Sequence, residues 1–400
     1  MAIDKVAVIG GGLMGSGIAQ VAAMAGQEVS LVEVSEDILG KALERVRSSL
    51  DKLSAKGQIQ ETTDIVLQRI KPDTSISRGL SDADLIVEAV FEDIDLKRRI
   101  VREATGSAPG HAILATNTSG LSIGMIAEAT DRKEKVVGMH WMNPPQLMKL
   151  VEVVRSKYTD DETLEQAVDL CRIYGKEPLV VQRDVWYFLA ARAHYGWSLT
   201  TSLTYLAGEA GFKEIDAVSR YRMGLPMGPF ELSDFTGAVN IRTGSLRSVD
   251  RILKSHPEFE PWPLFLAVFR HLVNELWGPM KEKGLTGVAA GKGYYTYHKG
   301  EYSKPDIPGE LAEKVDPIQL LAPAINMAAR CVSEGLGTIH DINKSFRLAY
   351  GWPKGIFEYI DMYSIDDIIY VLKARKQEAP EWLKDFYRID TLLERRFTSR

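Results

Sequence analysis

A glycine-rich turn between a short apolar strand and a helix is the feature that most constrains this chain. Residues 5–9 are β-forming and lead directly into Gly10, Gly12 and Gly15, spaced G-x-G-x-x-G, before a helix-like stretch over 13–25. The first glycine permits the tight turn, the second lets a pyrophosphate approach the backbone, and the third lets the helix pack on the strand. The helix N-terminus, at Leu13 and Met14, offers unpaired N–H groups to phosphates. The pattern predicts a dinucleotide-binding turn.

An acidic residue after the next strand indicates which dinucleotide binds. Glu33 ends the strand-like stretch over 28–33 and stands 18 residues beyond Gly15. A carboxylate there can accept a hydrogen bond from a ribose 2′-hydroxyl. No arginine stands immediately beside it in the sequence to bind a 2′-phosphate. We therefore predict NAD rather than NADP, and the alternative is a glycine-rich turn with a solvated glutamate.

Alternating strands and helices predict the fold class. Further buried-strand candidates lie over 85–90, 112–115 and 136–139, and an amphipathic stretch over 35–70 is expected to form two helices broken near Gly57. Such alternation is typical of a mostly parallel, doubly wound sheet. From Asp184 onward the sequence is helical and rich in aromatic residues. We predict an α/β Rossmann-like domain over 1–183, followed by an all-α half.

The all-α half contains an internal repeat. Residues 223–234 and 350–361 share the skeleton G-x-P-x-G-x-F-E-x-x-D at an offset of 127 residues. Repetition of this kind indicates two copies of one domain. We predict copy 1 over 184–298, a Pro- and Gly-rich linker over 299–317, and an incomplete copy 2 over 318–400. The skeleton itself is expected to be structural, because Gly and Pro cap and stop helices.

Composition excludes several classes of protein. The formal net charge of −5 gives no electrostatic pull toward nucleic acid or an anionic membrane. The chain has two cysteines, Cys171 and Cys331, far apart in the sequence, which excludes a disulfide scaffold and a cysteine-based zinc site. The uncharged stretch over 6–27 is too rich in glycine to be a membrane span or signal peptide. We expect a cytoplasmic protein without a metal.

One histidine stands in a setting suited to catalysis. His140 ends the apolar run over 136–139, at the edge of the predicted sheet where open α/β folds bind ligands. Glu152 lies in the next strand-like stretch and could orient the imidazole. Such a pair can take a proton from an alcohol as a hydride leaves for nicotinamide. Spacing alone leaves a structural histidine equally possible, and it leaves Ser119, after the strand over 112–115, as either a helix cap or a hydroxyl donor.

Together these motifs resemble the 3-hydroxyacyl-CoA dehydrogenase family, and the resemblance covers nearly the whole chain. The matching segments run through both halves: Gly10–Ala19, Val87–Ala89 with Glu92 and Lys97, Asn117–Ser119, Gly138–Pro145, Leu150–Val153, Gly224–Leu232 and Gly291–Tyr295. The histidine motif with its glutamate twelve residues later is the most specific of these. It favours an active-site position for His140 over a purely structural one.

The resemblance implies oxidation of a (3S)-3-hydroxyacyl-CoA to the ketone by NAD, or the reverse. His140 is then the general base, Glu152 its orienting partner, and Ser119 a donor to the substrate oxygen. Five residues fall at positions that contact the dinucleotide in the family: Glu33, Glu92, Lys97, Ser119 and Asn143. Asn143 is expected to contact the substrate as well. Lys52 and Lys56 lie where the family receives part of CoA, although a solvated charged face explains them equally well.

The two C-terminal copies resemble a longer variant of the family. In that variant the second copy can stand in for a dimer partner, so we expect either a pseudo-dimeric monomer or a homodimer. In some relatives the arrangement precedes a fused enoyl-CoA hydratase domain. A fused or associated hydratase is therefore a further expectation. An acyl-CoA is the expected substrate, with no nucleic acid and no membrane as partner.

The start of the helical half departs from the family pattern. Relatives carry a segment like D-x-P-G-F-x-x-N-R, whereas this chain has Trp186 and Tyr187 for Pro-Gly and Ala191 for the asparagine. Losing one preorganised polar contact can cost about 10²–10³ in rate. Two alternatives follow: a relative acting on another 3-hydroxy acid or CoA ester, and a catalytically impaired dinucleotide-binding paralogue. His194 and the hydroxyls of Thr200 and Thr201 are candidates to replace the lost amide.

Overall fold

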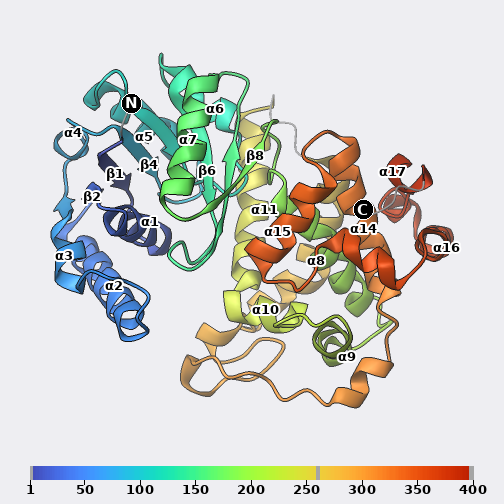
Figure 1. The fold of residues 1–400 in the computed structure, drawn as a ribbon. Coiled ribbons are helices and arrows are strands. Elements are labelled where there is room, and N and C mark those ends of the chain that lie inside the picture. The colour runs from blue at the N-terminus through green and yellow to red at the C-terminus, as the bar shows by residue number, and fades with distance from the viewer. Residues whose placement is uncertain (1–2, 258–261, 396–400) are drawn as a thin grey trace. The chain divides into compact units, whose positions relative to one another are not determined.

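The computed structural model describes residues 3–257 and 262–395, so the predicted second copy reaches outside the described residues over 396–400. The chain divides into two compact units, one up to Phe188 and one from Leu189 (Figure 1). Residues 184–188 belong to the first unit, where Asp184 accepts hydrogen bonds from Ser122 Oγ and the Gly124 N–H, both at 2.7 Å. Among the described residues no helix is long and apolar enough to cross a membrane.

The first unit is built on an eight-stranded sheet in the order β3-β2-β1-β4-β5-β6-β7-β8. Neighbouring strands are parallel except for the antiparallel pair β6 and β7. The strands are β1 (Lys5–Ile9), β2 (Glu28–Val32), β3 (Ile70–Asp73), β4 (Leu85–Glu88), β5 (Ile113–Thr116), β6 (Val136–Trp141), β7 (Leu150–Val154) and β8 (Glu177–Val181). The predicted doubly wound α/β fold is confirmed. Strands β3 and β8 were not predicted.

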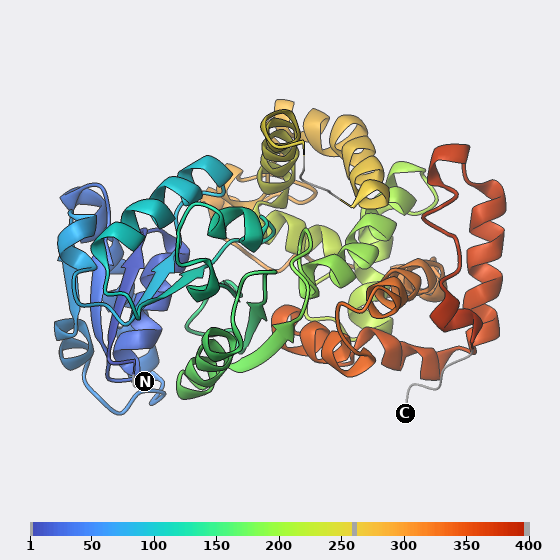
Figure 2. The ribbon, with the colours of Figure 1, turned by 90° about the horizontal axis from the view of Figure 1, so that it is seen from above.

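Helices cover both faces of this sheet, and Figure 2 shows the teal α5 and the green α7 on opposite sides. The helices are α1 (Leu13–Met24), α2 (Glu36–Ala55), α3 (Thr63–Gln68), α4 (Ile76–Gly79), α5 (Ile94–Ser107), α6 (Ile123–Ala127) and α7 (Asp161–Ile173). Apolar side chains of α1, α2 and α7 share one core with alternate residues of the strands. Because β1 pairs with both β2 and β4, the strand order reverses there, which opens a crevice at the carboxyl ends.

The second unit is helical, and its elements recur in the same order. The first series is α8 (Ala190–Leu206), α9 (Phe212–Ala217), α10 (Pro229–Thr236) and α11 (Ala238–Ser255). The second is α14 (Ile318–Ser333), α15 (Ile339–Tyr350), the 3-10 helix Ile356–Met362 and α16 (Ile365–Glu378). Helices α12 (Pro263–Leu272), α13 (Gly278–Glu282) and α17 (Thr391–Glu394) complete the unit, with isolated β-bridges over 287–296.

The repeated skeleton builds the same helix cap twice. Asp216 accepts hydrogen bonds from the Phe230 and Glu231 N–H groups at the start of α10, and Asn343 accepts one from the Phe357 N–H. A Cβ on Gly228 would lie 2.3 Å from the Asp216 side chain, so this glycine lets the cap approach. An ion pair also recurs, as Arg220 with Glu231 and Arg347 with Glu358. The skeleton therefore shapes helix ends, as its residue types suggest.

Residues 299–317, the predicted linker, contain little regular structure beyond 3-10 turns. They are nevertheless attached to the first helical series by side-chain hydrogen bonds. Arg220 donates to the Pro305 carbonyl, Tyr221 donates to the Ile307 carbonyl, and the Tyr302 hydroxyl donates to Glu231. This stretch is therefore a tethered connection between the two series.

Candidate active site

The glycine-rich turn has the geometry that a dinucleotide requires. Gly10 adopts a φ of +109°, and its N–H donates to the Val32 carbonyl at 2.8 Å, which joins the ends of β1 and β2. A Cβ on Gly15 would lie 1.8 Å from the Gly10 carbonyl oxygen, whereas a Cβ on Gly12 would meet nothing within 4 Å. Open space above Gly12, beside the N-terminus of the twelve-residue helix α1, fits a pyrophosphate.

Glu33 lies beside this turn and is bound to it. Its carboxylate accepts hydrogen bonds from the Gly11 and Val34 N–H groups, both at 2.7 Å. Arg45 of α2 donates to the carbonyl of the same glycine. Sequence analysis missed this arginine because it lies twelve residues beyond Glu33, and only the packing of α2 brings it to the turn. The peptide groups on both sides of Gly11 are thus fixed by charged side chains.

His140 and Glu152 face each other across the antiparallel pair β6 and β7. They are direct register partners, and the imidazole Nδ1 lies 2.7 Å from a carboxylate oxygen of Glu152. The Glu152 side chain is fully buried, and the His140 side chain is 12% exposed. The Phe188 ring packs against the imidazole with centroids 5.8 Å apart. An ionised Glu152 selects the tautomer with the proton on Nδ1, which leaves Nε2 free to accept a proton.

Ser119, Glu92 and Lys97 belong to one hydrogen-bonded network at the ends of β4 and β5. Glu92 accepts from the Ser119 N–H at 3.0 Å and hydroxyl at 3.2 Å, and from the Thr118 hydroxyl at 2.6 Å. Lys97 is buried between Glu88 at 2.8 Å and Glu92 at 3.3 Å. Burial lowers the pKa of this ammonium, but the two carboxylates outweigh it and raise the pKa. Lys97 therefore stays charged and fixes the carboxylate that holds Ser119.

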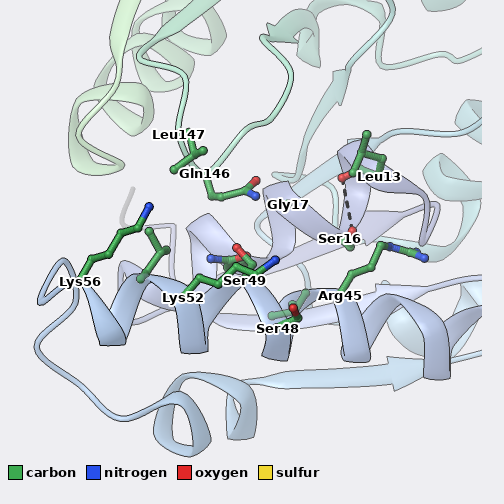
Figure 3. A pocket seen from close by; sticks show the side chains of 13 residues that line it. Leu13, Ser16, Gly17, Arg45, Ser48, Ser49, Lys52, Lys56, Gln146 and Leu147 are labelled. Atoms are coloured by element: carbon green, nitrogen blue, oxygen red, sulfur yellow. Dashed lines mark hydrogen bonds between the residues drawn. The ribbon is translucent and has the colours of Figure 1, made fainter. Parts of the chain in front are cut away.

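A basic pocket of about 400 Å³ lies between α1, α2 and the loop after β6. Lys52 and Lys56 line it from α2, together with Arg45 (Figure 3). Its other polar residues are Ser16, Gln20, Ser48, Ser49 and Gln146. Leu13, from the first turn of α1, contributes to the wall, so the pocket adjoins the glycine-rich turn. We call this cavity the basic pocket below.

The remaining predicted residues lie in different surroundings. Asn143 is exposed two residues after β6, and the Trp141 N–H before it donates to Asn117 Oδ1 at 3.0 Å. Met14 lies in the first turn of α1 and is partly buried. Two exposed apolar side chains beside Glu33 and Glu92, Val34 and Phe91, were missed by sequence analysis. Their exposure at the sheet's carboxyl edge could have been inferred from their positions directly after strands.

The candidate replacements for the missing amide have other partners. His194 stacks on Tyr350 with ring centroids 3.8 Å apart, and burial with the Arg242 charge lowers its pKa to about 3, so it stays neutral. Thr200 and Thr201 donate to carbonyls of their own helix at 2.6 and 3.0 Å. Ala191 itself lies in the first turn of α8. These contacts do not test whether the three groups replace the amide, which stays a prediction.

Tyr187 occupies a backbone conformation that normally favours glycine. Its φ is +64°, and its ring packs so closely on Gly120 that a Cβ there would lie 2.9 Å from the Tyr187 ring. Trp186 stacks on the same ring with centroids 4.7 Å apart. The position that carries glycine in the family thus keeps a glycine-like backbone here, while its side chain packs on Gly120, the residue after Ser119.

We expect the Tyr187→Gly variant to be more stable than Tyr187→Ala by about 1 kcal/mol in the free energy of unfolding. Both changes remove the ring, but only alanine keeps a Cβ at positive φ. Urea unfolding of the two variants measures the difference. In ordinary backbone the order is reversed, so greater stability of the alanine variant would contradict the assigned strain.

Comparison with known proteins identifies the family. Residues 5–185 match the family model of the 3-hydroxyacyl-CoA dehydrogenase NAD-binding domain, and residues 188–297 and 319–399 match that of the C-terminal domain. Mitochondrial hydroxyacyl-coenzyme A dehydrogenase of Mus musculus is 36% identical over 302 residues, which cover 74% of this chain and 91% of the relative. The predicted family and the prediction of NAD are confirmed.

Two further proteins extend the comparison. A peroxisomal fatty acid beta-oxidation multifunctional protein of Arabidopsis thaliana is 30% identical over 356 residues, 84% of this chain and 47% of the relative. The structure of 3-hydroxybutyryl-CoA dehydrogenase from Escherichia coli K12 superimposes with a TM-score of 0.81 over 99% of this chain and 98% of that one; at 24% identity this likeness supports the fold alone. From the matched family models and the mouse relative, the chain belongs to the 3-hydroxyacyl-CoA dehydrogenase family.

Proposed function

We propose that the protein oxidises (3S)-3-hydroxyacyl-CoA to 3-ketoacyl-CoA with NAD, or catalyses the reverse reaction. The observation that carries this proposal is the His140–Glu152 pair, whose Nδ1 to carboxylate distance is 2.7 Å. A buried carboxylate behind an imidazole is an arrangement suited to general base catalysis. The family and the glycine-rich turn supply the context in which that base would act.

In this mechanism His140 Nε2 takes the proton of the substrate 3-hydroxyl. Glu152 accepts the Nδ1 proton in a hydrogen bond, so it holds the ring in place and stabilises the imidazolium that forms. The Ser119 hydroxyl would exchange its 3.2 Å hydrogen bond to Glu92 for one to the substrate oxygen. When held at the glycine-rich turn, NAD would supply the acceptor for the hydride that leaves the substrate carbon. In the reverse reaction His140 returns its proton to the oxygen of the ketone.

The proposed contacts with NAD lie at the glycine-rich turn and after the carboxyl ends of the neighbouring strands. The N–H groups around Gly12, Leu13 and Met14 would hold the pyrophosphate. Glu33 would exchange its hydrogen bond with the Gly11 N–H for one from the ribose 2′-hydroxyl. Glu92, Lys97, Ser119 and Asn143 are proposed as further contacts, with Lys97 acting through Glu92 because its own ammonium is buried.

The basic pocket is the proposed site for the nucleotide end of CoA. Two lysines, an arginine and several hydroxyls there offer donors and positive charge to phosphate groups. CoA carries its phosphates at the end remote from the thioester. Binding that end in the basic pocket supplies affinity without contact with the reacting atoms.

We expect Lys52→Gln and Lys56→Gln each to raise the KM for acetoacetyl-CoA by about two- to fivefold, because exposed charge pairs contribute about 0.2–1 kcal/mol. The KM for NADH should stay the same, and the effect should shrink at high salt. Lys41→Gln, an exposed lysine on the same helix outside the pocket, is the control. An equal change in the control would remove the pocket from the proposal.

Ala191 stands where the family has asparagine, and this supports two alternatives. The protein would act on another 3-hydroxy acid or CoA ester, or its catalysis would be impaired. If a missing amide limits the rate, Ala191→Asn should raise kcat by at least about tenfold. Steady-state turnover of acetoacetyl-CoA with NADH measures this effect. Unchanged kcat would mean that Trp186 and Tyr187 have already reshaped the site for another substrate.

The proposed function is tested by following NADH oxidation in the presence of acetoacetyl-CoA, with NADPH as the control cofactor. Turnover that prefers NADH and depends on His140 supports the proposal. A folded protein that binds NADH but turns over no 3-ketoacyl-CoA would overturn it, and free 3-keto acids and other CoA esters would then be the substrates to test.

The oligomeric state, the partner domain and the cellular compartment are each proposed from a single observation. The double match to the C-terminal domain supports a pseudo-dimeric monomer over a homodimer. The plant multifunctional relative, about half of which this chain spans, supports a fused or associated enoyl-CoA hydratase. The two cysteines, both free and buried, suit a reducing cytoplasm.

A further inference from the structure

A buried lysine outside the catalytic group holds one wall of the basic pocket. Lys176 lies between α7 and β8 and is 7% exposed. Its ammonium donates to the Pro145 carbonyl at 2.6 Å and to the Met148 carbonyl at 2.8 Å. Among the described residues these two acceptors are backbone carbonyls, and no carboxylate forms an ion pair with the Lys176 ammonium. Burying an ammonium without an opposite charge costs free energy, even when backbone carbonyls accept its hydrogen bonds. We therefore look for a role of Lys176 in holding the segment that carries these carbonyls.

The two carbonyls belong to the loop that contributes the pocket's far wall. Gln146 and Leu147 lie between them in sequence, and Figure 3 shows both across the pocket from Lys52 and Lys56. The Leu147 and Met148 N–H groups both donate to the Pro144 carbonyl, so this stretch is a tight turn whose outer carbonyls face Lys176.

Helix α1 holds the same loop from another side. A Cβ on Gly17 would lie 3.0 Å from both Gln146 Oε1 and the Pro145 ring, so the glycine lets the loop approach α1 closely. The start of the loop is fixed separately, through the Trp141 N–H and Asn117. Lys176 therefore acts on the half of the loop that faces the basic pocket.

We infer that Lys176 is a positioning residue that sets the affinity of the basic pocket for the nucleotide end of the acyl-CoA substrate, by holding the turn that carries Gln146 and Leu147. This inference rests on the proposed function of the pocket. It predicts a specific pattern: weaker binding of the nucleotide end, with little change in the chemical step at His140.

The test measures binding of adenosine 3′,5′-bisphosphate by calorimetry and turnover of two substrates. Lys176→Met should weaken binding of the bisphosphate and raise the KM for acetoacetyl-CoA by about tenfold, because hydrogen bonds from a charged donor are lost. The kcat, and the kcat/KM for acetoacetyl-N-acetylcysteamine, which lacks the nucleotide, should change less than about twofold. Lys149→Met, an exposed lysine at the end of the same loop, is the matched control and should bind normally.

Lys176→Gln is the second variant, which keeps the test possible if Lys176→Met does not fold. It keeps a polar group in the buried site but is one atom too short to reach both carbonyls, so the same loss of affinity is expected. Equal losses with both substrates, or unchanged bisphosphate binding in either folded variant, would overturn the inference. So would absence of bisphosphate binding to the unsubstituted protein. Absence of turnover with intact bisphosphate binding would overturn the proposed function alone.

Discussion

The His140→Gln variant is expected to lose turnover by about 10²–10⁴-fold while its affinity for NADH stays close to that of the unsubstituted protein. Glutamine retains a polar group of similar size, but it cannot accept a proton at neutral pH. Strands β6 and β7 pair through their backbones, and no contact of the glycine-rich turn among the described residues involves His140, so its replacement leaves the sheet and the turn in place. Rapid-quench single turnovers and NADH fluorescence titration measure the two quantities.

Glu152→Gln serves as the companion variant. It keeps the volume of a fully buried side chain but weakens the support for the imidazolium. We expect its kcat to fall less than that of His140→Gln, because the base itself remains. Turnover by His140→Gln within about twofold of the original would exclude His140 as the base and with it the proposed mechanism.

The second large effect is expected at Gly15. In Gly15→Ala the new Cβ would lie 1.8 Å from the Gly10 carbonyl oxygen, and neither backbone can move without opening the turn. We expect a loss of about 1–3 kcal/mol in the free energy of unfolding, as for other overpacked sites. Binding of NADH should be lost at the same time, because the helix N-terminus moves away from the phosphates. Urea unfolding and NADH titration check the two effects.

Two glycines provide controls that separate stability from binding. A Cβ on Gly12 meets no atom within 4 Å, so Gly12→Ala should fold normally and still lose NADH binding, because the methyl group occupies the space proposed for the pyrophosphate. Gly40→Ala, near the start of α2 with equally open surroundings, should lower neither the free energy of unfolding nor the affinity for NADH. Normal NADH binding by Gly15→Ala would contradict the role given to this turn.

The sequence predicted that His140 and Glu152 pair, but it did not predict the partners of the cationic side chains in the same unit. His140 and Glu152 could be assigned to adjacent strands because His140 ends one apolar run and Glu152 lies within the next, with a proline turn between them. The buried position of Lys97 between Glu88 and Glu92 could not be predicted, because a lysine in an amphipathic helix is usually solvated. Arg45 and Lys176 were missed because each donates to a backbone carbonyl far away in the sequence.

The surroundings of His194 show the limit of sequence patterns. A histidine near the start of the helical half resembles a functional residue, but Tyr350, more than 150 residues later, stacks on its ring. Strand β3 was missed because two of its four residues, Ile-Lys-Pro-Asp, are charged and a third is proline, which suits only an edge strand.

Local chemistry explains what the sequence alone determined. The spacing of Gly10, Gly12 and Gly15, the carboxylate of Glu33 and the alternation of strands with helices specify a doubly wound sheet with an NAD site, since each depends on neighbouring residues. Only the tertiary structure decided which groups the charged side chains contact. Arg45 binds the glycine-rich turn, Lys97 binds Glu92, and Lys176 binds the loop after β6. Long side chains find such partners through packing between distant segments, and no local pattern encodes those contacts.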